Sequence, residues 1–401
     1  MRQQFLSFIL LLCLAAACAG GAMSVSPAAG TGTAPEQATP TPHTLWPQLI
    51  KTPNTQTIPS PTQQPLAFSS GVDISWLQEI EANGGLFYDQ GEPQDALTIF
   101  KRYGVDTIRL RLWVNPVHGY CNTEYTLEMA RRVKAAGFRL MLDFHYSDTW
   151  ADPAHQQKPA AWQDLPFDQL AKAVHDYTLE VMQRLKQQDT LPDSVQIGNE
   201  ISSGFLWPDG AVGGSHEANW PQFATLLKAG IAGVNDSLLP GEKVRVILHI
   251  DAGGNNAVAR WFFDHIQAEG VAYDIIGLSY YPWWHGTLEA LSANITDLRA
   301  RYSRPVWVVE TAYPWTLSSY SGGTQVSDPA KLLSAFPATQ QGQRDFLAAE
   351  QQVIRAAGGS GMFYWEPDFI PVPMHDSGWG NLGLFDNRGI ALPALSALAI
   401  Q

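Results

Sequence analysis

Cysteine is scarce in this chain, and so are runs of positive charge. Three cysteines occur in 401 residues, and Cys13 and Cys18 fall in an N-terminal apolar segment, so Cys121 has no partner for a disulfide within the folded part. Lys and Arg form no long runs, and the formal net charge is −13. This balance argues against a nucleic-acid or anionic-membrane partner and suits an uncharged one.

Two further signatures are missing. No Gly-rich phosphate loop follows the first expected strand, which lowers the case for a doubly wound open sheet that binds a nucleotide. His and Asp residues are scattered rather than set at zinc-ligand spacing. We therefore expect no metal in the site and no cofactor.

The first residues have the pattern of an export signal. Residues 1–18 combine Arg2 with an apolar core and small residues at the end, which is too short for a membrane span. The end, Ala16-Ala17-Cys18, resembles a bacterial lipobox, although Leu14 stands one residue too far back. We expect a signal peptide of the lipoprotein type with a lipid anchor at Cys18. Cleavage near Ala17 or Ala19 without lipid is the alternative, and in both cases the protein is extracellular or tethered to the cell surface.

Residues 19–67 are rich in Ala, Thr, Pro, Gly and Gln and nearly free of charge. Such a segment cannot bury enough apolar surface to offset its ordering entropy, so we expect a flexible linker. From residue 68 to residue 401 the pattern changes, and we expect one catalytic domain that acts as a monomer.

In that domain, short β-rich apolar runs alternate with amphipathic helical stretches. Eight strands separated by helices predict an α/β fold, a parallel (β/α)8 barrel of the TIM type. The expected strands are Gly71–Ser75, Thr107–Trp113, Arg139–Phe144, Ser194–Gly198, Val244–Ile250, Ile275–Tyr280, Pro305–Glu310 and Gly361–Trp365.

Working residues of such barrels lie at the C-terminal ends of strands. Polar or aromatic residues stand at the ends of most expected strands: Arg109 and Arg111; Asp143, His145 and Asp148; Asn199 and Glu200; His249 and Asp251; Tyr280 and Tyr281; Glu310; Trp365 and Glu366. The fourth strand ends in Asn199-Glu200 and the seventh in Glu310. Two carboxylates in one cleft are the minimum apparatus for breaking a glycosidic bond, one as a proton donor and one ionised. We expect Arg109 to keep Glu310 charged and Glu200 to stay protonated.

The motifs around these residues resemble one family, the arabinogalactan endo-β-1,4-galactanases of glycoside hydrolase family 53. They are Gly71–Ser75, Ile108–Pro116, Leu142–Pro153 with Lys158–Trp162, Val195–Glu200, Gly204–Pro208, Ser279–Pro282, Val309–Thr311 and Phe363–Pro367. The motif that begins at Leu142 is very specific, whereas Asn-Glu alone is not. The resemblance covers residues 68–401.

The resemblance implies endo-hydrolysis of β-1,4-galactan by a retaining double displacement, with Glu200 as acid/base and Glu310 as nucleophile. Retention requires the carboxyl groups about 5–5.5 Å apart. Some bacterial relatives carry a calcium ion after the seventh strand. Here Thr316–Gln343 has Asp328 as its only acid, so a structural calcium is doubtful.

Supporting roles follow from side-chain chemistry. Asn199 can donate to the sugar 2-hydroxyl. Arg109, and with it Arg111, can orient Glu310, although Arg111 could instead form an internal salt bridge, for example with Asp143. Either Tyr280 or Tyr281 can hydrogen-bond the nucleophile.

The remaining candidates would line the cleft. We expect His145 and Asp148 on its non-reducing side and Trp365 under the reacting sugar, with Trp113 extending the cleft. For His249 we expect a buried structural role.

Two other readings of the sequence stay open. A β-mannanase or β-1,4-glucanase on the same scaffold would use the same two glutamates, because one axial hydroxyl is a modest discriminator. A tethered glycan-binding protein without catalysis is the second, and intact Glu200 and Glu310 argue against it.

Overall fold

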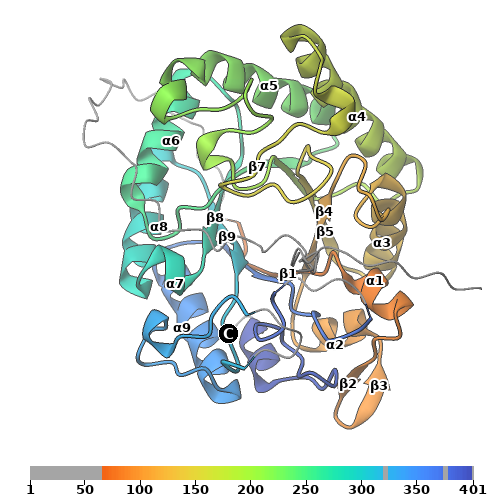
Figure 1. Cartoon of the computed structure of the whole chain (residues 1–401), viewed down its shortest axis with the longest axis vertical. Helices are drawn as coiled ribbons and strands as arrows, with labels where there is room; N and C mark the ends of the chain where they lie inside the picture. The colour runs from red at the N-terminus through yellow and green to blue at the C-terminus, as the bar shows by residue number, and fades with distance from the viewer. Residues whose placement is uncertain (1–65, 319–323, 374–377, 400–401) are drawn as a thin grey trace, which may run out of the picture. The chain divides into compact units, whose positions relative to one another are not determined.

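The computed structural model describes residues 66–318, 324–373 and 378–399 (Figure 1). The expected signal peptide and all but the last two residues of the expected linker lie outside this part of the chain. No helix within the described part is both long and apolar enough to cross a membrane.

Eight parallel strands close into a barrel, in the order β1-β10-β9-β8-β7-β6-β5-β4. The strands are β1 (Ser69–Asp73), β4 (Thr107–Leu112), β5 (Arg139–Phe144), β6 (Ser194–Ile197), β7 (Arg245–Ile250), β8 (Ile275–Tyr280), β9 (Val306–Thr311) and β10 (Gly361–Trp365). Each occupies an expected strand position to within two residues at either end. The predicted (β/α)8 barrel is therefore confirmed, and the open doubly wound sheet is wrong.

Helices follow the strands and surround the barrel (Figure 1). They are α1 (Leu77–Ala82), α2 (Ala96–Arg102), α3 (Thr123–Ala135), α4 (Phe167–Gln187), α5 (Trp220–Asp236), α6 (Asn256–Ala268), α7 (Pro282–His285), α8 (Leu288–Tyr302) and α9 (Gln340–Ala356). Several begin at a side-chain cap that accepts a hydrogen bond from a first-turn N–H. These caps are Asp95, Asn122, Asn255, Thr287 and Thr339.

The short elements were not expected from the sequence. They are α1, α7 and the antiparallel hairpin of β2 (Phe87–Asp89) and β3 (Glu92–Gln94). A helix of four or six residues shows too few turns for a helical period to be visible, and a three-residue strand has no alternation to read.

Two apolar clusters hold the barrel together. The larger one packs the outward strand residues against the helices. The smaller one joins inward residues of five strands and contains Met141, Ile247, Ile275, Trp307, Val309 and Phe363. Further along the same inward faces the side chains become polar, as in Met141 to Asp143 and Ile247 to His249. The inward side chains of the barrel therefore form an apolar plug toward the strand starts and a cluster of polar groups toward the strand ends, and we call this polar cluster the chamber.

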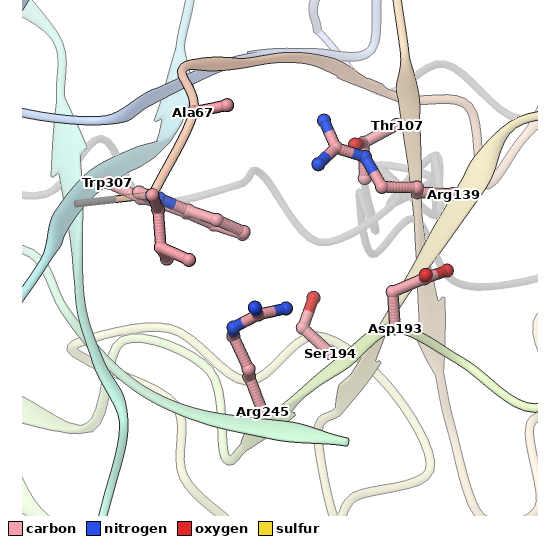
Figure 2. A pocket seen from close by; sticks show the side chains of 8 residues that line it. Ala67, Thr107, Arg139, Asp193, Ser194, Arg245 and Trp307 are labelled. Atoms are coloured by element: carbon pink, nitrogen blue, oxygen red, sulfur yellow. The ribbon is translucent and has the colours of Figure 1, made fainter. Parts of the chain in front are cut away.

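A cavity of about 220 Å³ lies at the starts of the strands (Figure 2). Thr107, Arg139, Ser194 and Arg245 are each the first residue of a strand and line it, with Trp307 alongside. It is thus at the opposite end of the barrel from the polar chamber and is separate from the candidate site.

Candidate active site

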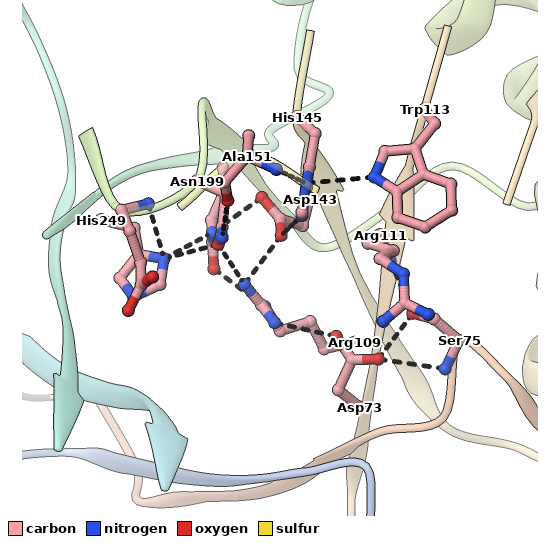
Figure 3. A network of polar contacts seen from close by, with 12 residues as sticks. Asp73, Ser75, Arg109, Arg111, Trp113, Asp143, His145, Ala151, Asn199 and His249 are labelled. Carbon is pink, nitrogen blue, oxygen red and sulfur yellow. Dashed lines mark hydrogen bonds and ion pairs between the residues drawn. The ribbon is translucent and has the colours of Figure 1, made fainter. Parts of the chain in front are cut away.

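Arg109, on β4, bonds side chains from four other strands of the barrel, and Figure 3 labels two of these partners, Asp73 and Asp143. Its guanidinium bonds Asp73 Oδ2 at 2.8 Å, Asp143 Oδ2 at 2.7 Å and Glu310 Oε1 at 2.9 Å. Gln196 Oε1 accepts from Nε at 3.1 Å. Burial alone would lower the pKa of Arg109, but the surrounding carboxylates Asp143, Glu310 and Asp73 raise it above the ordinary value. A permanently charged group therefore sits at the centre of the chamber.

A β-bulge turns Glu310 into the barrel. Trp307 and Val309 already face inward, so strict alternation would send Glu310 outward. The register of β9 shifts against both neighbours: Leu278 pairs with Val308 but Ser279 with Glu310, and a second shift occurs opposite β10. One extra residue on β9 reverses the alternation, so Glu310 faces Arg109. Thr311 then points outward to Glu350 of α9 at 2.9 Å.

Both oxygens of Glu310 are held by inward-facing donors. Arg109 engages Oε1, and the Tyr281 hydroxyl donates to Oε2 at 3.0 Å. Burial raises the pKa of Glu310 to about 7, while the Arg109 charge acts to lower it. Arg109 thus favours the ionised form, as expected, although burial outweighs it.

Glu200 follows β6 on a tight turn. Gly198 has φ +85°, and a Cβ there would lie 2.5 Å from the Ile201 side chain, so only glycine fits. Glu200 itself has φ 47° and ψ 50°, the left-handed region that a residue with a side chain adopts at a cost of about 1–2 kcal/mol. Burial raises its pKa well above the ordinary range, and the charges of Glu310 and Asp251 raise it further. Of the two carboxyls, Glu200 therefore keeps its proton more readily.

Asn199 is held from three sides. Its Oδ1 accepts from Arg109 at 2.9 Å, and its Nδ2 donates to the carbonyl O of Ala151 at 2.8 Å. His249 Nδ1 lies 2.9 Å from the same Oδ1. These contacts fix the orientation of the Asn199 amide.

The two carboxyls differ in how readily they hold a proton. A carboxyl that keeps its proton, as Glu200 does, beside one that is ionised, as Glu310 can be, is the apparatus of acid-assisted nucleophilic displacement.

Comparison of the sequence with protein-family models assigns the chain to a family. The model of glycosyl hydrolase family 53 matches residues 69–398. The chain belongs to glycoside hydrolase family 53. It is 39% identical over 340 residues to an arabinogalactan endo-β-1,4-galactanase of Cellvibrio japonicus, covering 82% of this chain and 89% of that one. An uncharacterized protein of Niallia circulans is 46% identical over 345 residues, covering 83% and 93%.

Solved structures agree with the family. The catalytic domain of family 53 from Ignisphaera aggregans superposes with a TM-score of 0.78 at 36% identity, covering 86% of this chain and 99% of that chain. A fungal β-1,4-galactanase gives a TM-score of 0.74 at 32% identity, covering 83% and 99%. A psychrophilic family 10 xylanase, at 13% identity, shares the fold alone.

In this family 53 chain, Arg111 does not orient Glu310. It lies fully buried and pairs with Glu366 Oε1 at 3.3 Å, so the expected contact with the nucleophile is wrong. The internal salt bridge exists, but Asp143 is not its partner. The Arg111 guanidinium instead stacks over Trp76 and Trp150, each with its ring centre at 4.3 Å, and over Trp113 at 5.1 Å.

His145 and Asp148 bind other parts of the protein. His145 Nδ1 accepts from the Trp113 indole and the Ala151 N–H, each at 3.2 Å, so its hydrogen is on Nε2 and points to Asp143 at 3.1 Å. Only 3% of its surface is exposed. Asp148 accepts from the backbone N–H groups of Asn115 and Ala160, which joins two loops. Both residues shape the walls of the chamber rather than offering open hydrogen-bonding groups to a sugar.

The two tyrosines at the end of β8, Tyr280 in the strand and Tyr281 directly after it, have different partners. Tyr281 reaches Glu310, whereas the Tyr280 hydroxyl donates to the carbonyl O of Gly286 at 2.8 Å. Of the two alternatives, Tyr281 is therefore the residue beside the carboxylate, and Tyr280 is not, because its side chain points out of the barrel.

Aromatic rings line one side of the chamber. Trp365 ends β10 and packs on Trp379 with ring centres 4.3 Å apart and on Trp150 at 5.7 Å. Trp113 packs on Trp150 at 5.2 Å and on Trp76 at 6.0 Å. Trp365 and Trp113 are thus parts of one aromatic wall, of which the sequence analysis missed the other three members.

Three polar residues were also missed. Asp73 and Gln196 both bond Arg109, and Ser279 donates to Glu200 Oε1 at 2.6 Å. All three lie within the motifs quoted above, and Ser279 shares the inward face of its strand with Tyr281, which is the signal that could have found them.

Within the described part of the chain, no group of three or more His, Cys, Asp or Glu side chains is placed to hold a metal ion. Asp328, the lone acid of the segment after β9, accepts from the N–H of Ala330 at the start of a short 3-10 helix.

Proposed function

We propose that this chain hydrolyses internal β-1,4-galactosidic bonds of galactan and arabinogalactan with retention of anomeric configuration. Family membership and the names of curated relatives support the substrate. The observation that carries the chemistry is the placement of two carboxyls, the half-buried Glu200 and the buried Glu310, at one end of the barrel. Ser279, which bonds Glu200 Oε1, lies opposite Glu310 in the register of β8 and β9. A sugar ring between the two carboxyls would meet an ionised oxygen and a protonated one.

Glu310 acts as the nucleophile. Its ionised oxygen attacks the anomeric carbon and forms the glycosyl-enzyme as the bond to the leaving chain breaks. Arg109 and Tyr281 hold the two oxygens, which fixes the direction of attack. Asn199 would contribute its amide to the sugar 2-hydroxyl, and Trp365 would lie under the reacting ring.

Glu200 acts as acid and then as base. In the first step it gives its proton to the oxygen of the leaving chain. In the second step its carboxylate takes a proton from water, which attacks the anomeric carbon and releases Glu310. Its raised pKa suits the first role, because it keeps the proton available at neutral pH.

Analysis of products from galactan over time tests this proposal. Early products of many lengths indicate endo action, and NMR of the first anomer formed reports retention. Mannan and cellulose are the matched controls. Hydrolysis of mannan alone would move the assignment to the mannanase reading, and hydrolysis of none to the glycan-binding one.

The location follows from the N-terminal segment. The protein is exported by residues 1–18, attached through lipid on Cys18 and spaced by residues 19–67, and it acts as a monomer. Cys18→Ala tests the anchor: activity should move from the cell fraction to the medium. An unchanged distribution would favour cleavage without lipid, and sedimentation of the purified enzyme reports the oligomeric state.

A further inference from the structure

Ser279 bridges the proposed acid/base and a buried histidine. It lies on the inward face of β8, fully buried. Its Oγ donates to Glu200 Oε1 at 2.6 Å and lies 2.8 Å from His249 Nε2. Among the described residues, Oε1 is the only side-chain oxygen of Glu200 with a hydrogen bond, so Oε2 remains for the substrate.

The contacts of His249 Nδ1 bear on which group donates and which accepts in the hydrogen bonds between His249, Ser279 and Glu200. Its Nδ1 faces two donors, Gln196 Nε2 at 3.1 Å and the Glu200 backbone N–H at 3.4 Å. It also faces an acceptor, Asn199 Oδ1, at 2.9 Å. The donors suit a ring with its hydrogen on Nε2, and the acceptor suits a ring with its hydrogen on Nδ1.

Ionised Glu200 selects one of these arrangements. The Ser279 hydroxyl must then donate to Oε1, which leaves Ser279 Oγ to accept from His249 Nε2–H. Burial holds the pKa of His249 well below its ordinary range, and Arg109, His145 and His285 lower it further. The ring is therefore neutral, and it directs the serine hydroxyl without adding charge.

We propose that Ser279, held by His249, is a positioning residue that stabilises the carboxylate form of Glu200 and reserves Oε2 for proton exchange with the substrate. The inference rests on the proposed role of Glu200. Three carboxylates around Glu200 oppose its ionisation: Glu310 from β9, Asp251 from the end of β7 and Asp152 from the loop after β5. Ser279 supplies the opposing contact, which the second step needs because Glu200 must then act as a base.

The test is the pH dependence of kcat/KM on galactan. Ser279→Ala removes the hydroxyl and should move the alkaline limb upward by about one pH unit, since a hydrogen bond to a charged group changes an ionisation constant by about tenfold. The acid limb, set by Glu310, should stay in place. Ser70→Ala is the matched control, because Ser70 is a buried strand serine that bonds the carbonyl O of Leu398. It should move neither limb.

A nitrophenyl β-galactobioside separates the two proposals. Its good leaving group needs no acid, so the alkaline limb should vanish in the wild-type enzyme. If the limb persists there, the acid/base role of Glu200 is wrong. If it vanishes but Ser279→Ala leaves the limb on galactan unmoved, the role of Ser279 alone is overturned. Should Ser279→Ala not fold, Ser279→Cys, a weaker donor of similar size, is judged by the same criterion.

Discussion

Tyr281 donates its hydroxyl hydrogen to Oε2 of Glu310 over 3.0 Å. The preceding residue, Tyr280, is buried on the other face of β8 and bonds the carbonyl O of Gly286. Two adjacent tyrosines thus offer a comparison in which one hydroxyl touches the proposed nucleophile and the other touches only the backbone.

Tyr281→Phe should lower kcat/KM on galactan by about 10–100-fold, because a hydrogen bond to a charged group contributes about 1.5–3 kcal/mol. Tyr280→Phe should lower the free energy of unfolding by about 1 kcal/mol and leave kcat/KM nearly unchanged. Steady-state kinetics and urea unfolding of both variants check this. Equal losses of activity would contradict the separation of the two roles.

Glu200→Ala should lose about 10²–10⁴-fold in activity on galactan, the usual contribution of a general acid. The loss should be much smaller on an aryl galactobioside with a good leaving group. Glu310→Ala should abolish turnover of both substrates while the protein remains folded, as judged by circular dichroism. A Glu200 variant equally impaired on both substrates would speak against its role as acid.

The pH profile of the wild-type enzyme should be bell-shaped in kcat/KM, which reports the free enzyme. Activity should rise with pH as Glu310 ionises, with a midpoint near its pKa of about 7. It should fall at higher pH as Glu200, whose pKa is raised further, loses its proton. Initial rates on galactan across the pH range measure both limbs. In Glu310→Ala with activity restored by an added external nucleophile, the acid limb should disappear. An acid limb that stays unchanged in this variant would refute the assignment.

Glu350 of α9 should make stability depend on pH. It is fully buried, only one of its oxygens is bonded, and burial raises its pKa well above the ordinary 4.5. Its folded-state pKa lies above its unfolded-state pKa. The folded protein therefore binds more protons between these values, and stability falls as pH rises, by up to about 1.4 kcal/mol per pH unit.

Glu350→Gln should remove this slope, so that the variant gains stability over the wild type as pH increases from about 5 to about 7. Urea unfolding at several pH values measures the difference. Glu128→Gln, on the exposed face of α3, is the matched control and should run parallel to the wild type. A Glu350→Gln curve parallel to the wild type would show that Glu350 is ionised when folded.

The sequence predicted the barrel because strand and helix periods alternate eight times, and it predicted Arg109 beside Glu310 because both stand near strand ends. It did not predict why Glu310 faces inward, since the bulge after Val308 leaves no mark in the alternation. The choice of Tyr281 was available, because Gly277, Ser279 and Tyr281 share one face of β8. The partner of Arg111 was not, although Glu366 directly follows β10, because tertiary packing decides which strand-end carboxylate Arg111 meets.

The polypeptide enters the barrel at Ser69, at the starts of the strands, and Leu66 packs against the apolar plug there. The paired carboxyls stand at the opposite rim. Whatever precedes residue 66 is therefore joined to the side remote from the catalytic mouth. The point at which the preceding residues join the barrel therefore leaves the catalytic mouth open to a long polysaccharide.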